Sequence, residues 1–110
     1  MFPKQRRIPR KIFPLLSNGA KTFRNKLFLL RFVVVEGSKS RFSFSVSKKI
    51  SKSAVVRNRL RRTGYKYLKE HLSAIKPNTL VQFSFVTNPK DNMEVGENIE
   101  SILKLSKLLE

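Results

Sequence analysis

Residues 51–69 read SKSAVVRNRLRRTGYKYLK and hold four arginines and one asparagine within the six positions 57–62. Ser51 or Ser53 can cap the first turn of a helix by accepting hydrogen bonds from its open backbone N–H groups, and no proline follows before Pro77. The stretch therefore predicts a helix whose apolar residues recur on one side at helical spacing. These residues are Val56, Leu60, Tyr67, Leu68, Leu72 and Ile75.

The opposite side of this helix is basic. At about 100° per residue, it gathers Asn58, Arg62, Tyr65 and Lys69, flanked by Arg59 and Lys66 on one edge and by Arg61 on the other. No acid occurs from residue 57 to residue 69, so this face repels itself unless a polyanion neutralises it. One interpretation is a merely solvated basic face. The other is a contact surface for a phosphate backbone, which arginine binds with a planar fork of donors.

The charge of the whole chain favours the phosphate surface. Its 110 residues suit a single domain, 1–110, with a formal net charge of +17 and a pI of about 11.1. Residues 1–90 carry 22 lysines and arginines and two acids, whereas residues 91–110 carry two lysines and five acids. We therefore expect a nucleic acid to bind the body of the domain and the C-terminal segment to face elsewhere.

Composition also excludes several kinds of site. The chain has no cysteine and one histidine, His71, so we predict no disulfide, no catalytic residue and no metal site. No apolar run approaches the ~18 residues of a membrane span, and the N-terminus lacks the apolar core of a signal peptide. We expect a cytoplasmic protein without membrane contact. Binding to anionic lipid is an alternative, but the apolar faces have the pattern of a buried core.

The N-terminal third begins with charge and proline. Residues 1–11 predict a basic, partly extended arm, and Pro9 can open a short helix that runs to about Ser17. Gly19 can end this helix in the left-handed conformation. Lys21–Lys26 is interpreted as a basic link.

Two β-rich segments follow this link. Leu27–Val35 is a nearly continuous apolar run that predicts a buried strand, and Arg41–Ser47 alternates strictly between apolar and polar residues. We predict that the two strands pair as a hairpin. The second strand would turn Phe42, Phe44 and Val46 to the core and a small polar face to the outside, made of Ser43, Ser45 and Ser47.

After the central helix, Lys76–Asn78 is a terminator and Leu80–Thr87 predicts a further strand. Asp91 and Glu94 have the spacing of a capping box for a C-terminal helix. Its inner side would carry Ile99, Ile102, Leu103 and either Leu105 or Ser106. The order is helix, two or three strands, helix, strand, helix. It predicts a small single-domain α+β sandwich with helices packed on one sheet.

The central helix and the segment before it resemble the protein subunit of bacterial ribonuclease P. The matching residues are Val46-Ser47-Lys48-Lys49-Ile50, the linker Ser51-Lys52-Ser53, and Ala54-Val55-Val56-Arg57-Asn58-Arg59-Leu60-Arg61-Arg62. The resemblance implies a mixed four-stranded sheet with a β-α-β crossover that contains this helix. It also implies a role in an endoribonuclease that removes the 5′ leader of precursor tRNA.

The resemblance further implies partners and roles. The partners are the ribonuclease P RNA, which carries the catalytic site and holds most of the magnesium, and precursor tRNA, with no obligate protein partner. RNA-binding residues would be Lys48, Lys49, Lys52, Arg57, Asn58, Arg59, Arg61, Arg62 and Lys66. Leader-binding residues would be Ile12, Phe13, Leu16, Ser45, Ser47 and Lys48, where either Phe13 or the pair Ile12 and Leu16 supplies the first helix's contact.

The sequence departs from the family pattern just after the arginines. Tyr65 and Lys66 stand where a basic residue, often followed by an acid, is usual, and Gly64 replaces an apolar residue. We expect Gly64 to weaken the helix by ~1 kcal/mol relative to alanine. Composition alone leaves open a structural RNA-binding protein, for example of the ribosome, and the matched residues favour the ribonuclease P subunit. A protein nuclease would need clustered carboxylates for a metal or a histidine base, and with only Glu36 and Glu70 as acids before position 91 no such constellation is available.

Overall fold

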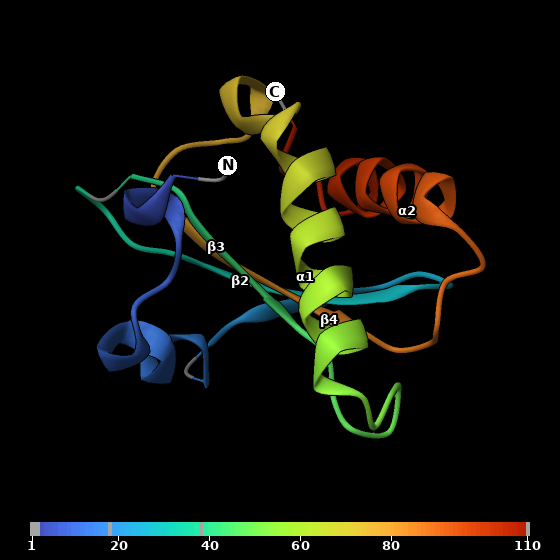
Figure 1. The fold of residues 1–110 in the computed structure, drawn as a ribbon. Coiled ribbons are helices and arrows are strands. Elements are labelled where there is room, and N and C mark those ends of the chain that lie inside the picture. The colour runs from blue at the N-terminus through green and yellow to red at the C-terminus, as the bar shows by residue number, and fades with distance from the viewer. Residues whose placement is uncertain (1–2, 18, 38, 110) are drawn as a thin grey trace.

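The computed structural model describes residues 3–17, 19–37 and 39–109, with the backbone alone for residues 10, 13 and 17. Figure 1 shows helices and strands in the predicted general order. The 3-10 helices are η1 (Lys4–Arg6), η2 (Arg10–Ser17) and η3 (Leu72–Ala74), and the α-helices are α1 (Ala54–Lys69) and α2 (Asn92–Leu105). The strands are β1 (Lys21–Arg24), β2 (Phe28–Val34), β3 (Arg41–Ser45) and β4 (Thr79–Phe85).

The four strands form one mixed sheet in the order β1-β2-β4-β3. β2 pairs antiparallel with both β1 and β4, while β3 pairs parallel with β4. β3, α1 and β4 thus form the β-α-β unit that the resemblance implies, and the α+β fold is confirmed. Parallel neighbours need a crossover, and α1 supplies it.

Two sequence predictions about the strands are wrong. The predicted hairpin of Leu27–Val35 with Arg41–Ser47 does not form, because β4 lies between these two strands. The predicted basic link, Lys21–Lys26, instead contains strand β1, which makes the hairpin with β2. β1 is a short edge strand with mostly exposed, charged residues, a composition that protects edges from further pairing and resembles a loop in the sequence.

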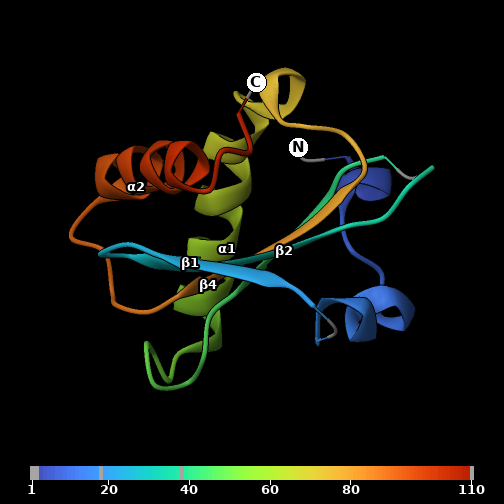
Figure 2. The same cartoon turned by 180° about the vertical axis from the view of Figure 1, so that it is seen from behind.

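The two α-helices cover one face of the sheet, whereas the N-terminal segment covers part of the other (Figures 1 and 2). Aromatic rings form the centre of the main core under α1 and α2: Phe28, Phe42, Phe44, Phe83 and Phe85. On the opposite face, Ile8 and Leu16 of the N-terminal segment pack on Leu80 of β4. The predicted first helix is a 3-10 helix with Pro14 inside it, and Gly19 follows with the expected positive φ of 73°.

Helix α1 approaches the sheet very closely at Gly64. This glycine is buried, and a Cβ built on it would lie 2.7 Å from the Phe44 ring. Gly64 therefore belongs to the inner face of the helix, between Leu60 and Leu68, and the glycine is a packing requirement rather than a simple weakness. A Cβ built on Gly96 of α2 would likewise lie 2.7 Å from the Tyr67 ring, so glycines allow the close approach of α1 to β3 and of α2 to α1.

Both α-helices begin at predicted caps, and of the two candidates for α1 the structure selects Ser53 over Ser51. The Ser53 hydroxyl accepts from the Val56 N–H, and the Asp91 carboxylate accepts from the Glu94 N–H. α1 ends at Lys69, earlier than the apolar stripe suggested, but Ile75 is still buried in the main core. In α2 the alternative between Leu105 and Ser106 is settled by burial, because Ser106 is buried and Leu105 is exposed.

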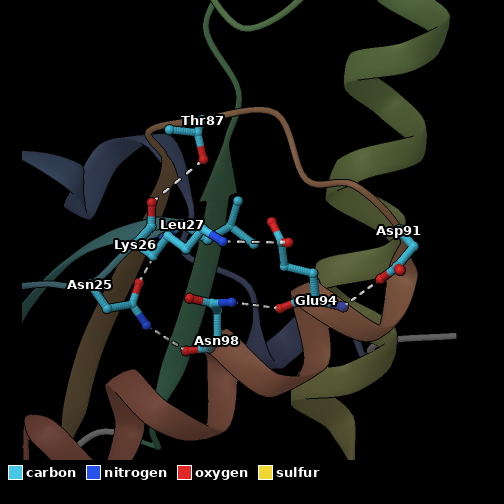
Figure 3. Close-up of polar contacts among 7 residues, drawn as sticks. All are labelled: Asn25, Lys26, Leu27, Thr87, Asp91, Glu94 and Asn98. Atoms are coloured by element: carbon cyan, nitrogen blue, oxygen red, sulfur yellow. Dashed lines mark hydrogen bonds and ion pairs between the residues drawn. The ribbon is translucent and has the colours of Figure 1, made fainter.

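Asn25 ties the β1–β2 turn to α2 (Figure 3). Its side-chain oxygen accepts from the backbone N–H groups of Leu27 and Phe28, and its Nδ2 donates to the carbonyl of Asn98 at 2.9 Å. In the same region the Lys26 ammonium lies 4.0 Å from the Glu94 carboxylate. One amide therefore fixes the turn and the position of α2 on the edge of the sheet.

We expect Asn25→Ala to lower the free energy of unfolding by about 1–3 kcal/mol, because it leaves three backbone groups without their side-chain partner. Urea unfolding followed by circular dichroism measures this change. Thr87→Val is the matched control in the same region, since the exposed Thr87 hydroxyl donates to the Lys26 carbonyl at 3.5 Å. If Asn25→Ala lowers the free energy of unfolding no more than Thr87→Val does, the hydrogen bonds of the Asn25 side chain are not important for stability.

Candidate nucleic-acid interface

The outer face of α1 presents the side chains predicted from the sequence. Asn58, Arg59, Arg62 and Lys66 are exposed, and the half-buried Arg61 donates to the Asn58 side-chain oxygen. The Ser53 cap fixes where the helix begins and so fixes which way these residues point. Regularly spaced cations without an acid between them suit contact with a phosphate backbone.

Arg57 differs from its neighbours, because its guanidinium folds back on the linker before the helix. It donates to the carbonyls of Ser51 and Lys52, at 2.9 and 3.0 Å. These bonds hold in place a turn that presents three exposed lysines, Lys48, Lys49 and Lys52. Arg57 thus has a structural task beside its charge, and the lysine-rich turn continues directly into the basic face of α1.

The N-terminal arm borders this face, which the sequence did not reveal. Arg7 forms a parallel bridge to Phe42, and the Ile8 N–H donates to the Phe42 carbonyl at 3.0 Å, so the arm follows the outer edge of β3. Arg6 donates to the Ser40 carbonyl at 2.7 Å and also to its hydroxyl. Only tertiary structure brings this part of the chain beside α1.

A hollow of about 540 Å³ lies between the arm and α1. The Arg7 guanidinium stands 4.8 Å from the centre of the Tyr65 ring, a cation–π contact that orients the arginine. The hollow is lined by Arg7, Val55, Asn58, Arg61, Arg62 and Tyr65. Three arginines and an amide around one concave surface can hold a phosphate by charge-assisted hydrogen bonds.

Tyr65 lies deeper than the sequence predicted. Its ring packs edge-on against Phe44, with 4.9 Å between centroids, and the Phe44 N–H donates to its hydroxyl at 3.4 Å. Burial raises the pKa of the Tyr65 phenol, while the Phe44 hydrogen bond and the charges of Arg7 and Arg61 oppose that rise. The prediction that Tyr65 lies on the outer face is wrong, because its half-buried side chain reaches β3 and packs there on Phe44.

A second candidate surface is the sheet face opposite α1 and α2. Register places Ser45 beside Ser84, and the Ser45 hydroxyl donates to the Ser84 hydroxyl at 3.0 Å. Ser43 is buried, whereas Ser47 and Lys48 are exposed beyond the end of β3. The adjacent strands add polar side chains that the sequence analysis did not include: Thr22, Arg24, Arg31, Gln82 and Ser84. Alternation in β4 could have identified Gln82 and Ser84, but not their neighbours.

Helix η2 borders this second surface. Leu16 is buried and, with the half-buried Ile12, packs near Leu80 and Val33, so Leu16 supports η2 from beneath. The side chain of Phe13 lies outside the described part of the structure. Of the sequence-predicted leader residues, Ser45, Ser47 and Lys48 therefore form a polar group at and beyond the end of β3, whereas Ile12 and Leu16 attach η2 to the sheet.

The described part of the chain contains no cluster of three or more His, Cys, Asp or Glu side chains arranged to hold a metal ion. Within the same residues, no helix has the length and apolarity needed to cross a membrane.

Comparisons with known proteins agree with this geometry. A family model described as Ribonuclease P matches residues 2–110. The structure is similar to RNase P protein from Staphylococcus aureus, with 23% identity and a TM-score of 0.83 over 96% of this chain and 98% of that chain. It is also similar to RNase P protein from Thermotoga maritima, with 22% identity and a TM-score of 0.76 over 90% and 96% of the two chains. No curated protein matches the sequence.

Proposed function

Because the chain belongs to the Ribonuclease P family, we propose that it is the protein component of a cytoplasmic ribonucleoprotein that removes the 5′ leader from precursor tRNA. The observation that carries this proposal is the acid-free basic face of α1, which the lysine-rich turn and Arg7 extend on either side. A concave cationic surface of this kind binds the backbone of a large RNA.

The catalytic RNA is the partner proposed for this basic surface. The exposed Asn58, Arg59, Arg62 and Lys66 contact its backbone, and Lys48, Lys49 and Lys52 extend the contact along the turn. Arg57 contributes charge while its own hydrogen bonds keep the turn in position. The hollow beside Tyr65 receives one phosphate between Arg7 and the arginines of α1.

The single-stranded leader is proposed to cross the polar face of the sheet. Small side chains such as Ser45 and Ser84 let a nucleic-acid backbone come close, and Arg31 and Arg24 on the neighbouring strands supply charge. Ser47 and Lys48 connect this surface to the lysine-rich turn. Helix η2 borders this surface through the half-buried Ile12. The base would stack on Phe13, the aromatic residue that the sequence offers in the first helix.

The chemical step is assigned to the RNA. Metal-assisted attack on a phosphodiester needs oxygen ligands and a positioned water, and the basic body of this chain, residues 1–90, has only two acids. We propose that the RNA holds most of the magnesium and that the protein positions the substrate. No obligate protein partner is required in this scheme.

The experiment that tests this function compares precursor tRNAs with different leaders. Added to the ribonuclease P RNA, the protein should lower the magnesium requirement and tighten binding of a substrate with a leader several nucleotides long. A substrate with a one-nucleotide leader should gain little, because its leader does not reach the sheet face. Steady-state cleavage at a series of magnesium concentrations provides both measurements, with the protein alone as the control.

If the protein improves binding and cleavage of both substrates equally, the sheet face does not bind the leader. The proposed RNA-binding role of α1 would be unaffected by that result. Specific cleavage by the protein without RNA would overturn the proposed function. Binding to the RNA without any effect on cleavage would instead support a purely structural RNA-binding protein.

A further inference from the structure

A groove of about 500 Å³ lies at the β1 edge of the sheet, beside the end of α2. β1, β2, the segment before β4 and the C-terminal turn all contribute to it. Its apolar walls include Phe23, Phe32, Val34 and Leu105, and its cationic rim is formed by Lys21, Lys76 and Lys107. Neither the basic face of α1 nor the polar sheet face includes these residues.

The floor of this groove is an aromatic pair. The rings of Phe23 and Phe32 stack with 6.1 Å between centroids and 12° between planes. Phe32 is buried, whereas Phe23 is half-buried, so part of the Phe23 ring remains accessible to a ligand. Val34 and Leu105 beside it are 62% and 53% exposed, which is unusual for large apolar side chains gathered in one place. The groove therefore offers a flat ring between two aliphatic walls.

The rim of the groove is purely cationic. Among the described residues that line it there is no acid, and no described carboxylate lies within 4.0 Å of the Lys21, Lys76 or Lys107 ammonium group. Lysine side chains that have no ion-pair partner among the described residues and surround an apolar concavity attract an anion that also has an apolar or aromatic part.

The backbone holds two of these lysines together. The Lys76 N–H donates to the Leu108 carbonyl at 2.8 Å, which joins the segment before β4 to the C-terminal turn. Lys107 itself has a φ of 61°, the left-handed region that non-glycine residues rarely adopt. This turn is kept by hydrogen bonds from Lys107 N–H to the Lys104 carbonyl and from Leu108 N–H to the Leu103 carbonyl, both at 3.1 Å. Lys76 and Lys107 thus project from a fixed frame.

We propose that this groove is a second binding site for single-stranded RNA, in which a base stacks on Phe23 and Lys21, Lys76 and Lys107 contact the flanking phosphates. The proposal rests on the RNA-binding function proposed above. Successive side chains of β1 alternate between faces, so Thr22 and Arg24 belong to the polar sheet face while Lys21 and Phe23 line the groove. A strand of RNA leaving the sheet face can pass over β1 into the groove.

An acidic peptide is the competing occupant. A peptide would satisfy the lysines, but it has no need of the flat Phe23 ring, whereas base stacking on an aromatic ring is the usual partner of backbone charge in single-strand binding. The combination of a stacked aromatic pair with three lysines therefore favours RNA.

The test is a titration of the full-length protein with oligouridylate, followed by methyl NMR. Val34 and Leu105 report on the groove, and Val55, exposed on α1, reports on the proposed interface with the catalytic RNA. Phe23→Leu should weaken the affinity fitted from the groove methyls about fivefold or more, since a stacked base loses its ring. The Val55 titration should stay unchanged, which also shows that the variant is folded.

The lysines are tested by salt dependence. Changing Lys21, Lys76 and Lys107 together to glutamine should lower the slope of log affinity against log salt at the groove methyls by about two, at ~0.7 per phosphate contact on a single strand. Lys90→Gln, an exposed lysine between β4 and α2, is the matched control and should leave this slope unchanged.

The proposal fails if the groove methyls do not respond to oligouridylate while Val55 does, a result that leaves the proposed function intact. It also fails if Phe23→Leu leaves the groove affinity as it was, or if polyglutamate binds there more tightly than oligouridylate. If the Val55 methyls do not respond to oligouridylate and the protein does not assist cleavage by the ribonuclease P RNA, the proposed function itself is wrong.

Discussion

Replacing Arg59, Arg62 and Lys66 together by alanine should weaken binding of the ribonuclease P RNA by roughly 100-fold or more. Each charge-assisted hydrogen bond is worth roughly 1 kcal/mol or more, and a tenfold change in affinity corresponds to about 1.4 kcal/mol. The three side chains are exposed on the outer face of α1, so the fold should not depend on them.

Binding measured over a range of salt concentrations checks this expectation. The slope of log affinity against log salt should fall by about 0.7–0.9 for each phosphate that the variant no longer neutralises. The free energy of unfolding should change by no more than about 0.5 kcal/mol, as for ordinary surface substitutions. Wild-type affinity in the triple variant would show that this helix is not the RNA interface.

Arg57 should be tested separately from these three residues. In the sequence it is equivalent to Arg59 and Arg62, but its guanidinium holds the carbonyls of Ser51 and Lys52. Its replacement by alanine removes a charge and also releases the lysine-rich turn, so a weaker affinity would have two causes. The triple variant without Arg57 keeps the charge effect apart from the structural one.

Gly64→Val should lower the free energy of unfolding by roughly 2–3 kcal/mol through overpacking. A Cβ added at this position would lie only 2.7 Å from the Phe44 ring, and valine adds two methyl groups to that Cβ. Phe44 is not able to move aside easily, because its ring stacks on Phe83 at 4.7 Å between centroids and contacts Tyr65 from the other side. Lys66→Val, an exposed position of the same helix, is the control for the lower helix propensity of valine.

A double-mutant cycle identifies the cause of this destabilisation. In a Phe44→Leu background the smaller side chain leaves room, so Gly64→Val should cost clearly less than it does in the wild-type protein. Chemical denaturation of the four proteins gives the coupling free energy. The same cost in both backgrounds would mean that the clash with Phe44 is not the reason for glycine at position 64.

The sequence by itself determined most of the local elements, strand β1 excepted, and the identity of the family. Ser53 and Asp91 cap their helices as predicted, Gly19 adopts a positive φ, and the alternation in Arg41–Ser47 correctly separates Phe42 and Phe44 from the polar side. These features could be read because they depend on residues close together in the chain. The run of arginines gave the basic face of α1 for the same reason.

Tertiary structure alone decided which strands are neighbours and how the surfaces are assembled. Periodicity records which face of a strand is buried but not which strand lies beside it, so β4 between β2 and β3 was missed. Gly64 has no side chain to mark it as apolar, and its place on the inner face became visible only against Phe44. Arg7 joins the basic face, and Lys76 comes to line the same groove as Lys107, through contacts between residues far apart in sequence. Such contacts form because folding buries the aromatic core, and no local pattern encodes them.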